Sequence, residues 1–109
     1  MPTADAIFSA LADPMRRQVL SMVVERGPVS ATSLGHTLPV SRQAVVKHLT
    51  VLRNAGLVAA QRQGQEVRYE LRSEALTEAS EWIAQLSARW DARLARLTTY
   101  LLSGELGGT

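Results

Sequence analysis

Two short helix-like segments separated by a proline constrain the fold of this chain more than any other feature. They cover about residues 30–38 and 41–54 and begin at Ser30 and Ser41, whose hydroxyls are good acceptors for a helix N-terminus. Pro39 ends the first segment, because the residue before a proline avoids the helical region. The two predicted helices are therefore joined by a very short turn.

A β-hairpin follows this helix pair directly. Gly56 ends the second helix, since glycine readily adopts the left-handed conformation beyond a helix terminus. Strands are predicted over residues 57–63 and 66–71, and Gly64-Gln65 between them is typical of a two-residue turn. The second strand has alternating apolar residues that compete for its inward face: Val67, Tyr69 and Leu71. A helix pair followed at once by a basic hairpin is typical of the winged helix-turn-helix.

Helices are predicted on both sides of this region. A short helix covers about residues 3–11, and another begins at Asp13-Pro14 and ends at Gly27-Pro28. The expected apolar face of this second helix contains Val19, Leu20, Val23 and Val24. The predicted fold is therefore mainly α with a small β-hairpin (α+β), in the order α-α-α-α-β-β-α, as a single domain over residues 1–109.

The last predicted helix runs from Ser73 to about Leu102 without glycine or proline. Its apolar residues follow the 3.6-residue period closely: Leu76, Ala79, Ile83, Leu86, Trp90, Leu94, Leu97 and Leu101. At about 1.5 Å per residue such a helix exceeds the width of a small head domain, so its stripe needs a covering surface. We expect a homodimer, with residues 1–12 and 74–102 as the dimerisation helices. A helix folded back on its own head is the alternative.

The predicted dimer interface combines the apolar face of the first helix with the second half of the last one. Its residues are Ile7, Phe8, Leu11, Trp90, Leu94, Leu97 and Leu101.

Charge is distributed unevenly along the chain. Residues 41–72 carry six basic and two acidic side chains, whereas residues 73–109 carry three basic and five acidic ones. A basic region beside a mildly acidic one suits a polyanion-binding surface next to an interaction module. Double-stranded DNA is the expected partner.

A helical wheel separates the residues of the 41–54 helix into two faces. The side expected to face the core carries Val45, Leu49 and Leu52. The opposite side is polar and includes Gln43, Lys47, Thr50 and Asn54, with Ala44 and Val46 on its flanks.

The polar side carries residue types that read DNA. Gln43 suits an adenine edge, Lys47 a guanine or a phosphate, and Val46 a thymine methyl group. Ser41 and Arg42 lie at the helix N-terminus, where free N–H groups favour a phosphate. On the hairpin, Arg62 and Arg68 are predicted to contact the DNA backbone or the minor groove. Arg53 and Arg72 are further candidates for contacts to outer phosphates of the DNA. The predicted DNA-binding residues are Ser41, Arg42, Gln43, Ala44, Val46, Lys47, Thr50, Arg62, Gln63 and Arg68.

Residues 40–58, VSRQAVVKHLTVLRNAGLV, resemble the recognition helix of the ArsR/SmtB family of winged helix-turn-helix repressors. The matching residues are Ser41, Val45, His48, Leu49, Leu52, Arg53, Ala55, Gly56, Leu57 and Val58. The segment 8–23 is similar to the family's first two helices through Leu11, Asp13, Arg16, Arg17 and Leu20, and the segment 62–71 to its wing. The resemblance covers about residues 5–102 and implies a dimer on an inverted-repeat operator, often released by an effector.

The metal sites common in this family lack their ligands here. The segment 30–38 has no cysteine, and the last helix has no histidine. A transition metal needs three or four converging ligands, and the chain contains only His36 and His48. We expect no metal at these sites, no cofactor and a metal-less branch of the family, with an unidentified small-molecule effector as a candidate partner.

Other functional classes find little support in the residues. We expect no enzymatic activity, because neither a phosphate-binding glycine loop nor a credible nucleophile and base is recognisable. The absence of cysteine excludes disulfides, and no apolar run approaches the ~18 residues of a membrane span, so a soluble cytoplasmic protein with no membrane partner is expected. A winged-helix protein-interaction module without DNA binding stays open as the alternative.

Overall fold

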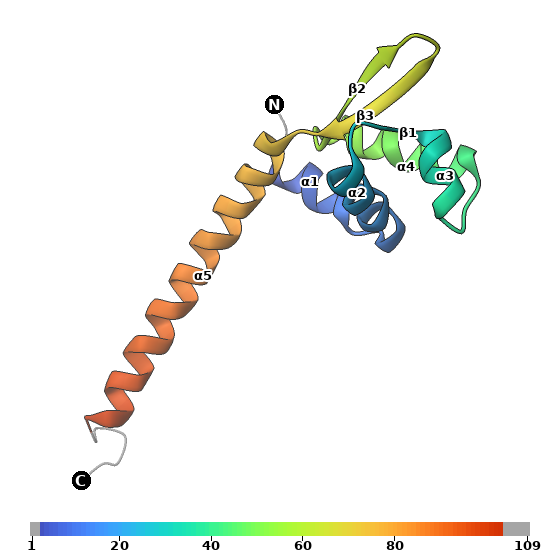
Figure 1. Cartoon of the computed structure of the whole chain (residues 1–109). Coiled ribbons are helices and arrows are strands. Elements are labelled where there is room, and N and C mark those ends of the chain that lie inside the picture. Colours follow the sequence, from blue (N-terminus) through green and yellow to red (C-terminus); the bar gives the residue numbers. More distant parts are fainter. Residues whose placement is uncertain (1–2, 104–109) are drawn as a thin grey trace. The chain divides into compact units, whose positions relative to one another are not determined.

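The computed structural model describes residues 3–103 and has the predicted helices and hairpin in the predicted order (Figure 1). The elements are α1 (Ala4–Leu11), α2 (Pro14–Arg26), β1 (Val29–Ser30), α3 (Ala31–Thr37), α4 (Arg42–Asn54), β2 (Val58–Gln63), β3 (Glu66–Leu71) and α5 (Ser73–Leu102). The predicted fold class is confirmed. The chain divides into two compact units, unit 1 (residues 1–79) and unit 2 (residues 80–109), and each is described by itself.

Side-chain caps start the helices of unit 1 where the sequence predicts them. Asp13 Oδ1 accepts a hydrogen bond from the backbone N–H of Met15 at 2.7 Å, one residue beyond Pro14 in the first turn of α2. The hydroxyls of Ser30 and Ser41 accept backbone N–H bonds at the starts of α3 and α4, each at 3.1 Å. These acceptors satisfy N–H groups that a helix leaves without a partner in its first turn.

Two consecutive arginines of α2 hold the C-terminal end of α1. Arg16 Nε donates to the carbonyl of Ala10 at 2.6 Å, and Arg17 Nη1 donates to that of Leu11 at 2.7 Å. Longer bonds of 3.3 Å reach the carbonyls of two neighbouring residues, Ser9 and Ala12. Because the last carbonyls of a helix have no partner within it, these cationic donors both satisfy them and fix α1 on α2.

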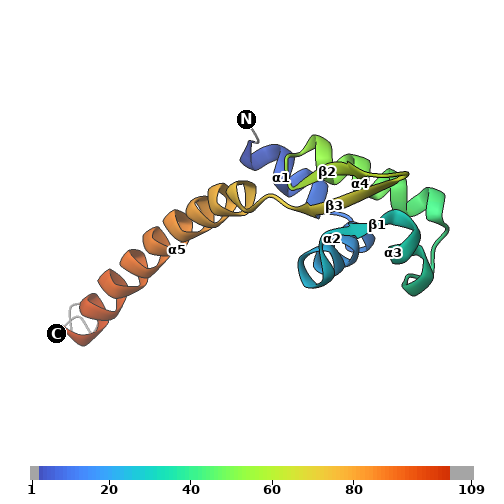
Figure 2. The same cartoon turned by 45° about the horizontal axis from the view of Figure 1, so that its top comes forward.

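The hairpin is part of a three-stranded antiparallel sheet in the order β1-β3-β2. The pairing of Gln63 with Glu66 leaves Gly64-Gln65 as the two-residue turn, and Gly64 has the positive φ of 63° that a glycine-first turn requires. The extra strand β1 was not predicted, because two residues are too few to show a period. It lies beside β3 (Figure 2), with Val29 opposite Tyr69.

The core of unit 1 lies between the helices and the sheet. Its largest fully buried side chains are Ile7, Leu34, Leu49, Leu52, Leu57, Val19, Val23, Val45 and Val58. Three of the four residues predicted for the apolar face of α2 are buried, but Val24 is 54% exposed and that prediction was wrong. Val24 lies about 100° around the helix from Val23, beyond the edge of the buried sector, whereas Met22 lies within it.

Over the described part of the chain, none of the helices combines the length and hydropathy needed to cross a membrane.

Candidate nucleic-acid interface

Helices α3 and α4 form a compact pair joined by residues 38–41. Leu38 is buried and Val40 packs against the core, so the turn between the helices is anchored at two points. Ser41 ends the turn and caps α4. The first turn of α4 is therefore held at a fixed place beside α3, as in a helix-turn-helix.

The two faces of α4 differ sharply, as predicted. Val45, Leu49 and Leu52 are each 0% exposed, whereas Gln43, Lys47 and Thr50 are exposed on other sides of the helix. The Thr50 hydroxyl donates to the carbonyl of Val46 at 2.9 Å, which leaves its oxygen free to accept a bond from a ligand. Ser41 and Arg42 are also exposed. Burial of the apolar side thus fixes which side chains α4 presents to a partner.

The two flanking residues are only partly available. Ala44 and Val46 are half-buried, and Val46 packs against the core of unit 1. Their accessible parts form the shallow edge of the polar face, next to the longer Gln43 and Lys47.

Arg42 has a partner that sequence reasoning missed. Its Nε donates to the hydroxyl of Thr32, on α3, at 3.0 Å. This bond uses one edge of the guanidinium and leaves the terminal nitrogens for another acceptor. Thr32 thus positions Arg42, although the pattern of capping residues around Ser30 gave no sign of this contact.

The wing arginines lie on opposite faces of the hairpin. Residues directly opposite each other in an antiparallel pair share a face, and Arg62 is opposite Val67 whereas Arg68 is opposite Gln61. Arg62 therefore lies on the face of Val67 and Tyr69, the face that includes core residues.

Each of these wing arginines also has a local partner. Arg62 Nε donates to the carbonyl of Gly64 at 3.4 Å, whereas Arg68 pairs with Glu66 at 3.3 Å. Gln63, opposite Glu66 at the turn, is exposed. The predicted wing residues thus surround the hairpin tip, but they do not present one common surface.

A cleft of about 300 Å³ separates the wing from the helix pair. It is lined by residues of four elements and the hairpin turn: Ser30, Ala31, Thr32, Arg42, Val46, Gln65, Glu66, Val67 and Tyr69. The positioned guanidinium of Arg42 and the partly buried Val46 thus meet the wing at one concave surface.

The N-terminal cap of α2 is electrostatically linked to α4. The hydrogen bond from the backbone N–H of Met15 lowers the pKa of the Asp13 carboxyl, and the charges of Arg16 and of His48, on α4, act in the same direction. His48 is half-buried on its helix. Asp13 therefore stays ionised to lower pH than an ordinary aspartate.

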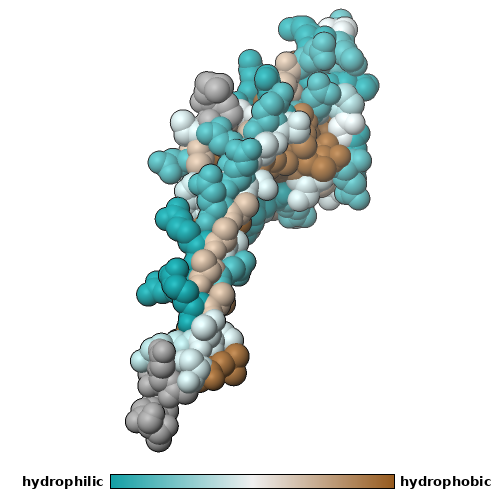
Figure 3. Space-filling view, turned by 90° about the vertical axis from the view of Figure 1, so that its left-hand side faces the viewer, coloured by the Kyte–Doolittle hydropathy of each residue, from teal (hydrophilic) through white to brown (hydrophobic). Residues whose placement is uncertain are grey.

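The residues predicted for a dimer interface differ in exposure. Ile7 is 0% exposed in the core of unit 1, so only Phe8 and Leu11, which are half-buried, retain accessible surface on α1. The α5 residues of the set are all exposed by 43% or more: Trp90, Leu94, Leu97 and Leu101. The face of α5 seen in Figure 3 carries hydrophilic side chains beside a narrow row of weakly apolar ones, so the helix is amphipathic.

Within residues 3–103, no three histidine, aspartate or glutamate side chains are grouped so that they could hold a metal ion.

Comparison with known proteins agrees with this geometry. Residues 11–60, from the end of α1 to the middle of β2, match a family described as "Helix-turn-helix domain". An ArsR-like transcriptional regulator from Rhodococcus sp. RHA1 has a similar structure, with a TM-score of 0.76 and 38% identity over 88% of this chain and 90% of that one. This chain belongs to the ArsR family. It is a DNA-binding transcriptional regulator.

Two proteins of Bacillus subtilis strain 168 are similar to this ArsR-family regulator. The uncharacterized HTH-type transcriptional regulator YuzN is 42% identical over 66 residues, which cover 55% of this chain and 72% of YuzN. The transcriptional repressor SdpR is 26% identical over 85 residues, which cover 78% of this chain and 93% of SdpR. A protein-interaction module without DNA binding is not favoured by these relatives.

Proposed function

We propose that this ArsR-family regulator is a homodimeric repressor that binds an inverted-repeat operator in double-stranded DNA. The observation that carries the proposal is the polar, solvent-exposed side of α4, opposite a completely buried apolar side in a helix-turn-helix. The similarity to SdpR, which is named as a repressor, supports repression.

In this proposal α4 enters the major groove. Gln43 pairs with an adenine edge, Lys47 reaches a guanine or a phosphate, and the Thr50 oxygen accepts a hydrogen bond beside them. The exposed edge of Val46 touches a thymine methyl group, and that of Ala44 faces the same groove. Ser41 and the terminal nitrogens of Arg42 hold a backbone phosphate at the start of the helix.

The wing contributes from two sides. Because Arg62 and Arg68 lie on different faces of the hairpin, they contact different parts of the backbone or minor groove. Gln63 lies at the tip, on the same face as Arg68. Arg68 must exchange its exposed partner Glu66 for a phosphate, which is a small loss for a solvent-accessible ion pair.

A second copy of the chain covers the apolar stripe of α5. The stripe residues in unit 2 are large and accessible, and an exposed patch of this kind marks an interface. In the single domain that we propose over residues 1–109, α1 contributes through Phe8 and Leu11. Two-fold symmetry then places two recognition helices about one helical turn of DNA apart.

Such a regulator acts in the cytoplasm, has no enzymatic activity and is a candidate for control by a small molecule.

The test measures binding to duplex DNA from upstream of the protein's own gene by fluorescence anisotropy at several salt concentrations. We expect a sequence-dependent affinity that falls steeply with salt, because phosphate contacts release counterions. The Lys47→Ala and Arg68→Ala variants should weaken binding and flatten its salt dependence, whereas Arg26→Ala, at the far end of α2, should not. If both variants retain the affinity and the slope, the assigned reading surface is wrong.

A further inference from the structure

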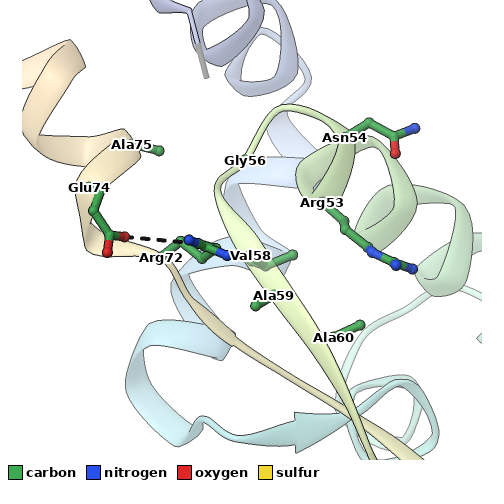
Figure 4. A pocket seen from close by; sticks show the side chains of 9 residues that line it. All are labelled: Arg53, Asn54, Gly56, Val58, Ala59, Ala60, Arg72, Glu74 and Ala75. Carbon is green, nitrogen blue, oxygen red and sulfur yellow. Dashed lines mark ion pairs between the residues drawn. The ribbon is translucent and has the colours of Figure 1, made fainter. Parts of the chain in front are cut away.

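A second cleft in unit 1 lies outside the proposed reading surface. It has a volume of about 620 Å³, within the range of sites for small molecules. Its walls come from the last turn of α4, the first half of β2, and the junction of β3 with α5 (Figure 4). The junction is held against the segment between α4 and β2 by the backbone N–H of Arg72, which donates to the carbonyl of Leu57 at 2.8 Å.

The cleft exists because the residues between its walls are small. Ala59 and Ala60 on β2, Ala75 on α5 and Gly56 carry no atom beyond Cβ, and Figure 4 shows the alanine side chains as short stubs. Ala59 and Ala60 are consecutive in β2, so their side chains point to opposite faces, and Ala59 lies on the side of Arg72 in Figure 4. A larger residue at Ala59 would occupy the space beside Arg72. The opening can therefore be closed by a single substitution.

Two arginines from different elements give the cleft its chemistry. Arg53 extends from α4, and Arg72 precedes α5 (Figure 4). Glu74 is the one acidic residue of the lining and pairs with Arg72 at 3.9 Å, with both side chains more than half exposed. Such an ion pair is weak and exchanges readily, so the lining has a net positive charge and a guanidinium that can change partners.

Backbone carbonyls at the end of α4 do not oppose an anion strongly. The carbonyl of Arg53 accepts the N–H of Gly56 at 2.9 Å, and that of Leu52 accepts the N–H of Leu57 at 2.9 Å. The partly negative end of the helix is thereby largely satisfied. Asn54 adds an amide that can donate to an oxygen.

We propose that this cleft binds a small organic anion through carboxylate or phosphate groups held by Arg53 and Arg72. The planar guanidinium fork matches both oxyanions, and two forks on separate walls suit a ligand with two anionic groups. Arg53 and Asn54 belong to the recognition helix, so the bound anion adds negative charge beside the DNA-reading element. Occupation therefore weakens DNA binding, a consequence that rests on the function of α4.

Binding is tested without DNA, so that its result is independent of the regulator's DNA site. Succinate and inorganic phosphate are titrated into the ¹⁵N-labelled protein at constant ionic strength, and NMR shifts are followed for the side-chain N–H groups of Arg53, Arg72 and Asn54. We expect saturable shifts confined to the cleft. Shifts spread equally over the other arginines would overturn the proposal.

Four variants sharpen this experiment. Arg53→Gln and Arg72→Gln should each weaken binding about tenfold or more, because each removes charged hydrogen bonds. Ala59→Leu retains both arginines and should abolish binding by filling the cleft. Glu74→Gln frees Arg72 and should strengthen binding, whereas the exposed Arg26→Gln is the matched control. Unchanged affinity in the first three variants would refute the site.

A final measurement separates a free anion from a DNA phosphate, since Arg53 and Arg72 also suit phosphate contacts. Without succinate, the two glutamine variants should bind DNA with the wild-type affinity and salt dependence. With succinate, DNA affinity should fall in the wild type alone. A lower salt slope in the variants, by about one per lost contact, would assign the cleft to DNA and overturn the proposal.

Discussion

Helix α4 and the part of α5 in unit 2 are both amphipathic, but they differ in what happens to the apolar side. In α4 the side chains of Val45, Leu49 and Leu52 are all 0% exposed. In α5 the corresponding side chains of Trp90, Leu94 and Leu97 are 43–58% exposed. An equally clear apolar period thus leads to a core in one helix and to an open stripe in the other. The period shows which side needs cover, and the surrounding structure decides whether the chain provides it.

The largest loss of stability is expected where the apolar side chains are completely buried. Leu49→Ala should lower the free energy of unfolding by about 2–5 kcal/mol, because it removes buried methyl groups and leaves a cavity. Denaturant unfolding at fixed protein concentration measures this. Val51→Ala, on the same helix but 39% exposed, is the matched control and should cost about 0.5 kcal/mol or less. Equal losses would show that α4 is not anchored as described.

The next effect concerns the open stripe. Leu94→Lys should raise the dimer dissociation constant at least ~30-fold, since it places a charge in a desolvated contact, while unit 1 keeps its fold. Sedimentation at micromolar concentration, with circular dichroism as the folding check, tests both parts. Ala88→Lys, on the other side of the helical wheel, should remain dimeric. A wild-type protein that is monomeric would contradict the proposed dimer.

A smaller loss is expected when α1 is released from α2. Arg16→Ala removes donors to two carbonyls of α1 and should cost unit 1 about 1–2 kcal/mol, because both bonds are charge-assisted and the bond to Ala10 is partly buried. Urea unfolding provides the measurement, with Arg26→Ala as the comparison. A loss no greater than that of Arg26→Ala would mean that these bonds do not hold α1.

A similar or slightly smaller effect is expected at the reading surface. Thr32→Val should reduce DNA affinity about fivefold, because Arg42 loses the bond that positions it, a change of about 1 kcal/mol. Thr32→Ser keeps the hydroxyl and should bind as the wild type does. Combining Thr32→Val with Arg42→Ala should add little to Arg42→Ala alone, and full additivity would disprove the coupling.

The weakest effect depends on pH. The pKa of Asp13 lies below its usual value of about 3.9, so ionised Asp13 stabilises the folded state above that value and this contribution is lost as pH falls through the folded pKa. Unfolding measured from pH 6 to pH 3 should show a steeper acid loss in the wild type than in Asp13→Asn, whose amide still caps the helix. If the free energy of unfolding fell equally with pH in both proteins, the loss of stability in acid would come from other carboxylates.

The helices and the hairpin could be predicted because their signals are local. Asp13-Pro14, Ser30 and Ser41 satisfy backbone groups within three residues, and Gly64 alone provides the turn conformation. Periodicity likewise identified the reading side of α4, because the polar residues opposite a buried stripe must face outward. Val24 shows the limit of this reasoning, because the helical period predicts which residues lie at the centre of an apolar face better than which lie at its edge.

Other features depend on residues that are distant in the chain. Strand β1 exists because Val29 meets Tyr69, forty residues later, and neither has a local pattern that shows the pairing. The bond from Arg42 to Thr32 depends on how α3 and α4 pack, and the cleft between Arg53 and Arg72 on how α4, β2 and the start of α5 converge.

The sequence by itself therefore determined the order of the elements, their caps and the polar side of α4. Tertiary structure alone decided which cations are paired, which wing arginine lies on which face, and where small residues leave a cleft. The physical reason is range: capping and periodicity act over a few residues, whereas these contacts form only once the core has brought separate segments together.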